Sequence, residues 1–125
     1  MQIPDNVNFV INGLAGKQVI RQNEYTVKIL AVSDQVVERI YALSSNGQFQ
    51  DVELILGCGD LPYPYLEYLV TMLNIRMYYV PGNHDPKFDP SSREAHAEGG
   101  SNLDLKTVRY KKFLIGGLGG CIRYR

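Results

Sequence analysis

Three adjacent polar residues follow a short apolar run in the sequence "YYVPGNHD", residues 78–85. Asn83, His84 and Asp85 come directly after a Pro-Gly pair that turns the chain. An amide, an imidazole and a carboxylate side by side can bind metal ions or transfer protons. Gly82 and Asn83 account for a turn but leave the His-Asp pair unexplained, so we interpret this loop as part of an active site.

Two more carboxylates occur at equivalent places in the sequence. Asp34 follows the apolar run "VKILAV" and Asp60 follows "LILGCG". Together with the Asn83 amide they supply oxygen ligands for divalent cations, and a carboxylate between two ions about 4 Å apart can bridge them. Taken singly, Asp34 is also typical of a helix N-cap and Asp60 of an ordinary turn. Their shared position after strand-like runs favours a common site.

The pattern around these residues predicts alternating strands and helices. Nearly continuous apolar runs predict buried strands, and apolar residues at i, i+3 and i+4 spacing predict helices. The expected strands cover residues 25–32, 52–56 and 75–80, and the expected helices cover 36–47 and 61–74. This order implies an α/β fold with a parallel sheet, in which the carboxyl ends of the strands lie at one edge. The three polar clusters are therefore expected to converge there.

The remaining segments predict less regular structure. Residues 1–25, with the glycine-interrupted stretch from Val7 to Arg21, are expected to form an N-terminal extension or a short hairpin. Residues 87–102 are rich in Ser, Gly, Pro and charge and predict an exposed loop, with His96 solvated.

The last segment, "LKTVRYKKFLIGGLGG", predicts two strands that turn at the Lys111-Lys112 pair. Basic residues around this segment are expected to face solvent. Arg123 follows the second strand and is a candidate contact for a substrate phosphate.

Bulk properties limit the classes of protein. With 125 residues, 45% hydrophobic and 21% charged residues and zero net charge, the chain suits one globular domain, 1–125, and is not disordered or collagen-like. The neutral charge gives no general attraction for nucleic acid or anionic membranes. The sequence has neither a secretory signal pattern nor a long apolar run, so we expect a soluble cytoplasmic protein with no membrane partner. Oligomeric state is not indicated.

Taken together, the motifs "VSD" (32–34), "GD" (59–60) and "GNHD" (82–85) resemble those of the calcineurin-like metallophosphoesterases. The resemblance is strong over residues 27–85 and looser up to Gly120. It implies a sandwich of two mixed β-sheets flanked by helices. This chain resembles the N-terminal portion of that fold, and its end at "CIRYR" favours a fragment of a longer protein.

The resemblance also implies roles for the candidate residues. Asp34 matches a ligand of the first metal, Asp60 the carboxylate that bridges both metals, and Asn83 a ligand of the second. His84 matches the catalytic histidine, and Asp85 matches the acidic residue that closes the motif and orients its neighbours. The implied activity is hydrolysis of a phosphomonoester or phosphodiester substrate with two divalent ions, manganese, iron, zinc or similar.

The sequence departs from the family pattern at several positions. The usual Asp-x-His motif has Val36 in place of the histidine, and Tyr63 stands where a further Asp often follows. The later Gly-His-x-His motif is missing, and the only histidines are His84 and His96. These departures keep open an alternative function, a scaffold or interaction module that has lost catalysis. A flavodoxin-like nucleotide-binding domain is disfavoured because no glycine-rich loop follows the first strand.

Overall fold

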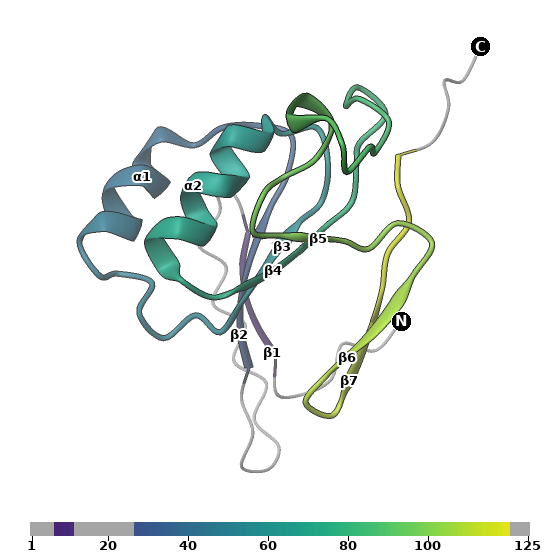
Figure 1. Ribbon diagram of the computed structural model, residues 1–125. Coiled ribbons are helices and arrows are strands. Elements are labelled where there is room, and N and C mark those ends of the chain that lie inside the picture. Colours follow the sequence, from purple (N-terminus) through teal and green to yellow (C-terminus); the bar gives the residue numbers. More distant parts are fainter. Residues whose placement is uncertain (1–6, 12–26, 121–125) are drawn as a thin grey trace.

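A parallel five-stranded sheet forms the centre of the structure, a computed structural model that describes residues 7–11 and 27–120 (Figure 1). The strands follow the order β1-β2-β3-β4-β5, and all neighbours are parallel. Their bounds are β1 Val7–Ile11, β2 Val27–Val32, β3 Leu54–Gly57, β4 Arg76–Tyr79 and β5 Ser101–Asn102. The architecture is therefore mixed α/β.

Helices and a hairpin complete the fold. The helices are α1 Glu38–Ser45, α2 Tyr63–Leu73 and the short 3-10 helix η1 Arg93–Ala95. β6 Thr107–Tyr110 and β7 Phe113–Gly116 form a separate antiparallel hairpin. In Figure 1, α1 and α2 lie on one side of the sheet and the hairpin on the other.

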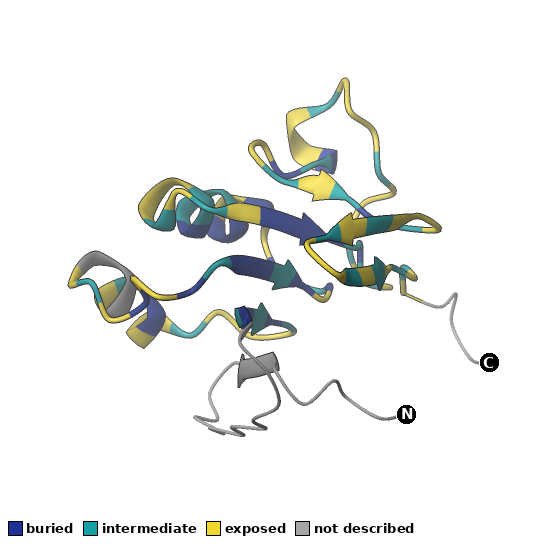
Figure 2. Cartoon of the chain, turned by 90° about the horizontal axis from the view of Figure 1, so that it is seen from below, coloured by how far each residue is buried: buried dark blue, intermediate teal, exposed yellow. Residues whose placement is uncertain are grey.

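Alternating side chains of the strands build two cores. Leu30 and Val32 of β2 face the helices, where they join Leu69 of α2 in one buried cluster. Val27 and Ile29 point the opposite way, toward the hairpin, in a second cluster. This period of two is the signature of a strand buried on both faces, and Figure 2 shows the resulting buried strands between more exposed layers.

The predicted strands and helices between residues 27 and 80 are confirmed, as is the hairpin that turns at Lys111-Lys112. Residues 25 and 26, the start of the first predicted strand, lie outside the described residues. α1 begins later than predicted, at Glu38, because the chain turns first: Asp34 has φ 64° and the Gln35 N–H donates to the Ser33 carbonyl.

Two predictions about the irregular segments need correction. Val7–Ile11 is a strand of the main sheet, paired in parallel with β2, and not a hairpin or irregular extension; the rest of that predicted extension lies outside the described residues. The predicted loop over residues 87–102 contains η1 and β5, and Ala95 and Ala97 are buried in it. His96 is half-buried, with Nδ1 2.5 Å from the Ser92 carbonyl oxygen, and so is not fully solvated.

Candidate functional site

The candidate residues lie at the carboxyl edge of the parallel sheet. Adjacent strands end at the same level, since Val32 of β2 pairs with Gly57 of β3, and Gly57 pairs with Tyr79 of β4. Asp34, Asp60 and the Asn83–Asp85 turn follow these three strand ends. The predicted convergence of three loops at one edge is confirmed.

Asp60 and Asp85 connect the loops after β3 and β4. The Asp60 N–H donates to Asp85 Oδ2 at 2.8 Å, and the Gly82 N–H donates to the same oxygen at 2.7 Å. In return, Asp60 Oδ1 accepts the His84 N–H at 2.9 Å. Each carboxylate therefore receives a backbone N–H from the other loop, which fixes their relative position.

His84 reaches Asp60 with its ring as well as its backbone. Nδ1 lies 3.3 Å from Asp60 Oδ1, and Nε2 lies 3.4 Å from Asn83 Nδ2. Both contacts are hydrogen bonds in the tautomer in which Nδ1–H donates to Asp60 Oδ1 and Nε2 accepts a hydrogen bond from the Asn83 amide N–H. The His84 side chain is nevertheless 77% exposed, so it is oriented by its neighbours and open to a ligand.

Glycine allows the two loops to approach this closely. A Cβ on Gly82 would lie 2.2 Å from Asp60 Oδ1, and a Cβ on Gly59 would lie 2.8 Å from Gly82 Cα. Gly59 also has φ +95°, which side chains rarely adopt. Gly59 and Gly82, which precede the polar residues, therefore allow the two loops to contact each other.

Asp34 joins the same edge through its backbone. Its N–H donates to the Gly59 carbonyl at 3.2 Å, and its carboxylate accepts a hydrogen bond from the Ser33 hydroxyl. Desolvation raises the pKa of the Cys58 thiol, although the residue as a whole is exposed, and the negative charge of Asp34 raises it further. Asp34 is itself exposed, so its carboxylate faces solvent near the β3 loop.

Tyr63 packs beside the candidate site, a placement that the sequence patterns did not predict. Its hydroxyl donates to the Pro86 carbonyl at 3.4 Å, and its ring meets that of Tyr79 edge to face, with centroids 5.8 Å apart. Burial, the charge of Asp85 and then Tyr79 raise the pKa of Tyr63 to about 12. The phenol therefore stays neutral at physiological pH beside the Asp85 carboxylate.

The donor set fits divalent cations only in part. Asp34, Asp60 and Asn83 offer oxygen ligands at one edge, yet among residues 7–11 and 27–120 no group of three or more His, Cys, Asp or Glu side chains is placed to hold a metal. Water would have to complete the coordination of any ion bound here. Arg123, the candidate phosphate contact, lies outside the described residues.

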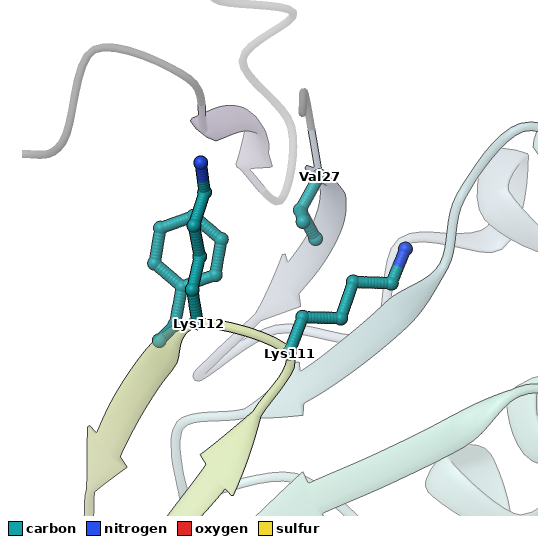
Figure 3. Close-up of a pocket in the computed structure, with 4 residues that line it drawn as sticks. Val27, Lys111 and Lys112 are labelled. Carbon is teal, nitrogen blue, oxygen red and sulfur yellow. The ribbon is translucent and has the colours of Figure 1, made fainter. Parts of the chain in front are cut away.

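The cavity in Figure 3 is separate from these residues. It has a volume of about 310 Å³ and is lined by Val27 at the start of β2 and by Lys111, Lys112 and Phe113 at the hairpin turn. Its lining is almost entirely apolar. It therefore lies at the amino end of β2, away from the loops that carry Asp34 and Asp60.

Comparison with known proteins adds no family assignment. No protein-family model, curated protein or solved structure matches the chain. No helix in the described part of the chain is both long enough and apolar enough to cross a membrane.

Proposed function

We propose that this chain carries the metal-binding edge of a metal-dependent phosphoesterase that hydrolyses phosphomonoesters or phosphodiesters. In this proposal Asp34, Asp60 and Asn83 bind divalent ions such as manganese, iron or zinc. The fold in this proposal is a metallophosphoesterase-like sandwich of two mixed sheets flanked by helices. The resemblance of the three loop motifs to calcineurin-like enzymes suggests this class.

The observation that carries the proposal is the arrangement around Asp60. Its carboxylate receives both the backbone N–H and the ring Nδ1 of His84, at 2.9 and 3.3 Å. The same residue is tied through its own N–H to Asp85. A metal ligand and a proton-transfer group are thus held together by a fixed loop, and the His84 side chain is still open to solvent.

Each residue of the site has its own role in the proposed hydrolysis. Divalent ions held by Asp34, Asp60 and Asn83 would supply Lewis acidity toward a phosphate oxygen and would lower the pKa of bound water. Asp60 orients the His84 ring through Nδ1, and Nε2, the ring nitrogen beside the Asn83 amide, is the atom that would transfer a proton to the leaving oxygen. Asp85 fixes the turn that presents Asn83 and His84, and does so without binding the ions itself.

Hydrolysis of bis-p-nitrophenyl phosphate with added Mn²⁺ tests the proposal. We expect Mn²⁺-dependent hydrolysis that Asp60→Ala abolishes. Asp89→Ala is the matched control, because Asp89 lies in an exposed turn where its carboxylate accepts the Ser91 N–H at 2.9 Å. Absence of Mn²⁺-dependent hydrolysis, or hydrolysis undiminished by Asp60→Ala, overturns the proposal.

The alternative is a scaffold module of the same fold that has lost catalysis. Two observations favour this alternative. Val36 occupies the position where the resembled motif has a histidine, and the number of candidate metal ligands is small. It predicts no bound manganese, iron or zinc by elemental analysis, together with a protein partner that co-purifies at a fixed ratio.

A further inference from the structure

Asp104 lies between β5 and β6 and belongs to none of the motifs around the candidate site. Its Oδ1 accepts the Gly119 N–H at 2.6 Å. A Cβ on Gly119 would lie 2.9 Å from Asp104 Oδ2, so the carboxylate lies directly against the backbone of that segment. Asp104 is half-buried there.

Residues 117–120, which we call the glycine strap, are attached to the same part of the chain at their start. The Gly117 carbonyl accepts the Leu105 N–H at 3.0 Å, and the Gly117 N–H donates to the Lys106 carbonyl at 3.1 Å. Gly117 also forms a parallel bridge with Asp104. The strap is therefore fixed to residues 104–106 before it reaches the site.

The far end of the strap touches the candidate site. The Gly120 N–H donates to the Pro81 carbonyl at 2.8 Å. A Cβ on Gly120 would lie 2.2 Å from the Asn83 nitrogen and 2.6 Å from the Gly82 carbonyl carbon. The strap thus packs backbone to backbone against the turn that presents Asn83 and His84.

The segment that holds the strap is itself hydrogen-bonded to β4, the strand that leads into this turn. Leu103, 4% exposed, donates its N–H to the Tyr79 carbonyl at the end of β4. β4 leads directly into Pro81 and Asn83, while Leu103 leads into Asp104 and so to the strap. The turn is consequently supported on two sides, by Asp60 and Asp85 and by the strap.

We propose that Asp104 is a positioning residue for the Asn83–His84 turn, and that it acts through the glycine strap. Its carboxylate accepts a hydrogen bond from the Gly119 N–H, outside the loops that carry the candidate ligands. Its carboxylate fixes Gly119, Gly119 fixes Gly120, and Gly120 sets how far the turn can move away from Asp60. The effect on metal binding rests on the proposed function, but the effect on the turn does not.

Amide hydrogen exchange of the metal-free protein tests the effect on the turn. The Gly82 and His84 amides report on it, because they donate to Asp85 and Asp60. Asp104→Ala removes the charged acceptor of the Gly119 N–H, which loosens the strap against the turn. We therefore expect the Gly82 and His84 amides to exchange roughly tenfold faster in this variant. Exchange in β2 and β3 should stay unchanged, and exchange at wild-type rates at both turn amides overturns the proposal.

Matched variants separate this effect from a general loss of stability. Asp104→Asn keeps a side-chain oxygen that can accept the Gly119 N–H, so exchange is expected to return toward the wild-type rate. Asp89→Ala removes another carboxylate that accepts a nearby backbone N–H, and should leave the turn amides unchanged. Equal acceleration in Asp89→Ala and Asp104→Ala contradicts a specific role for Asp104.

A glycine pair tests the strap even where Asp104→Ala does not fold. Gly120→Ala forces a methyl group against Asn83, whereas a Cβ on Gly116 meets nothing within 4 Å. We expect faster exchange at the turn amides in Gly120→Ala and no change in Gly116→Ala. Identical exchange in the two variants overturns the role of the strap.

A metal readout extends the test to the proposed activity. With Mn²⁺-dependent hydrolysis, Asp104→Ala should raise the Mn²⁺ concentration for half-maximal activity roughly 10-fold, because the turn that presents Asn83 is displaced. A reduced kcat with an unchanged Mn²⁺ requirement contradicts positioning through Asn83. If the wild-type chain shows no hydrolysis, the phosphoesterase proposal fails while amide exchange still decides the role of Asp104.

Discussion

Asp85 Oδ2 lies 2.8 Å from the Asp60 nitrogen and accepts its N–H, and the Gly82 N–H donates to the same oxygen at 2.7 Å. One carboxylate oxygen therefore joins the loops that follow β3 and β4. Asp60 in turn receives the His84 N–H. The candidate ligand and the candidate acid are positioned by this exchange of hydrogen bonds between loops.

Asp85→Ala should destabilise the protein by about 1 to 3 kcal/mol, because two partly buried N–H groups lose a charged acceptor. Asp85→Asn keeps one carbonyl oxygen and should lose less than half as much. Urea unfolding monitored by circular dichroism measures the change. Asp89→Ala is the control, since its carboxylate is exposed, and an equal loss in Asp85→Ala and Asp89→Ala would contradict the role given to Asp85.

Tyr63 makes stability fall at high pH. Its pKa is raised from 10 to about 12, first by burial and then by Asp85, so the unfolded chain releases the phenol proton at lower pH than the folded one. The contribution of Tyr63 is therefore complete below pH 10 and is lost as pH rises from 10 through about 12.

Urea unfolding between pH 9 and about pH 11.5 checks this prediction. Tyr63→Phe lacks the ionising group, so its free energy of unfolding should fall less steeply above pH 10 than that of the wild type. Tyr65 and Tyr79, whose pKa values are also raised by burial, contribute equally to both curves. Parallel pH profiles for the two proteins would show that Tyr63 is not perturbed.

Local sequence patterns were sufficient to predict β2, β3 and β4 and the helices α1 and α2 between them. Val27–Val32 and Leu54–Gly57 are short, mostly apolar runs buried on both faces. Ser33 and Asp34 follow the first run directly, and Asp60 follows the second after Cys58 and Gly59. β1 was not predicted because its pairing is not local. Val7 pairs with Val27, 20 residues later in the sequence, and no local pattern shows that these two segments are neighbours in the sheet. β5 has only two residues, too few for a pattern, and it exists through its pairing with β4.

The rule that parallel strands end at one edge correctly predicted that the loops of Asp34, Asp60 and Asn83 converge. It could not predict which groups make contact within that edge. The contact of Asp60 with His84 joins residues 24 apart, and the hydrogen bond of Gly120 with Pro81 joins segments farther apart still. The glycine-rich run at 116–120 was the only sequence signal of that contact, since close backbone approach requires glycine.

Gly82→Ala should disrupt the candidate site more than it disrupts the fold. A methyl group there would lie 2.2 Å from Asp60 Oδ1, so the turn must move away from Asp60. Forced overpacking of this kind costs about 1 to 3 kcal/mol. Urea unfolding measures that loss, and loss of protection at the His84 amide would locate it. Gly116→Ala, where the methyl group meets nothing within 4 Å, should leave both unchanged.

Mn²⁺ should stabilise this chain only weakly, because three side-chain ligands from Asp34, Asp60 and Asn83 leave the other coordination positions to water. A ligand that binds the folded state raises Tm as its concentration exceeds Kd. We therefore expect Tm to rise with Mn²⁺ only at high concentrations of the ion. The rise should vanish in Asp60→Ala, which removes the shared ligand, and persist in Asp89→Ala. A rise of the same size in wild type and Asp60→Ala would place the bound Mn²⁺ elsewhere and contradict the assignment of Asp60 as a ligand.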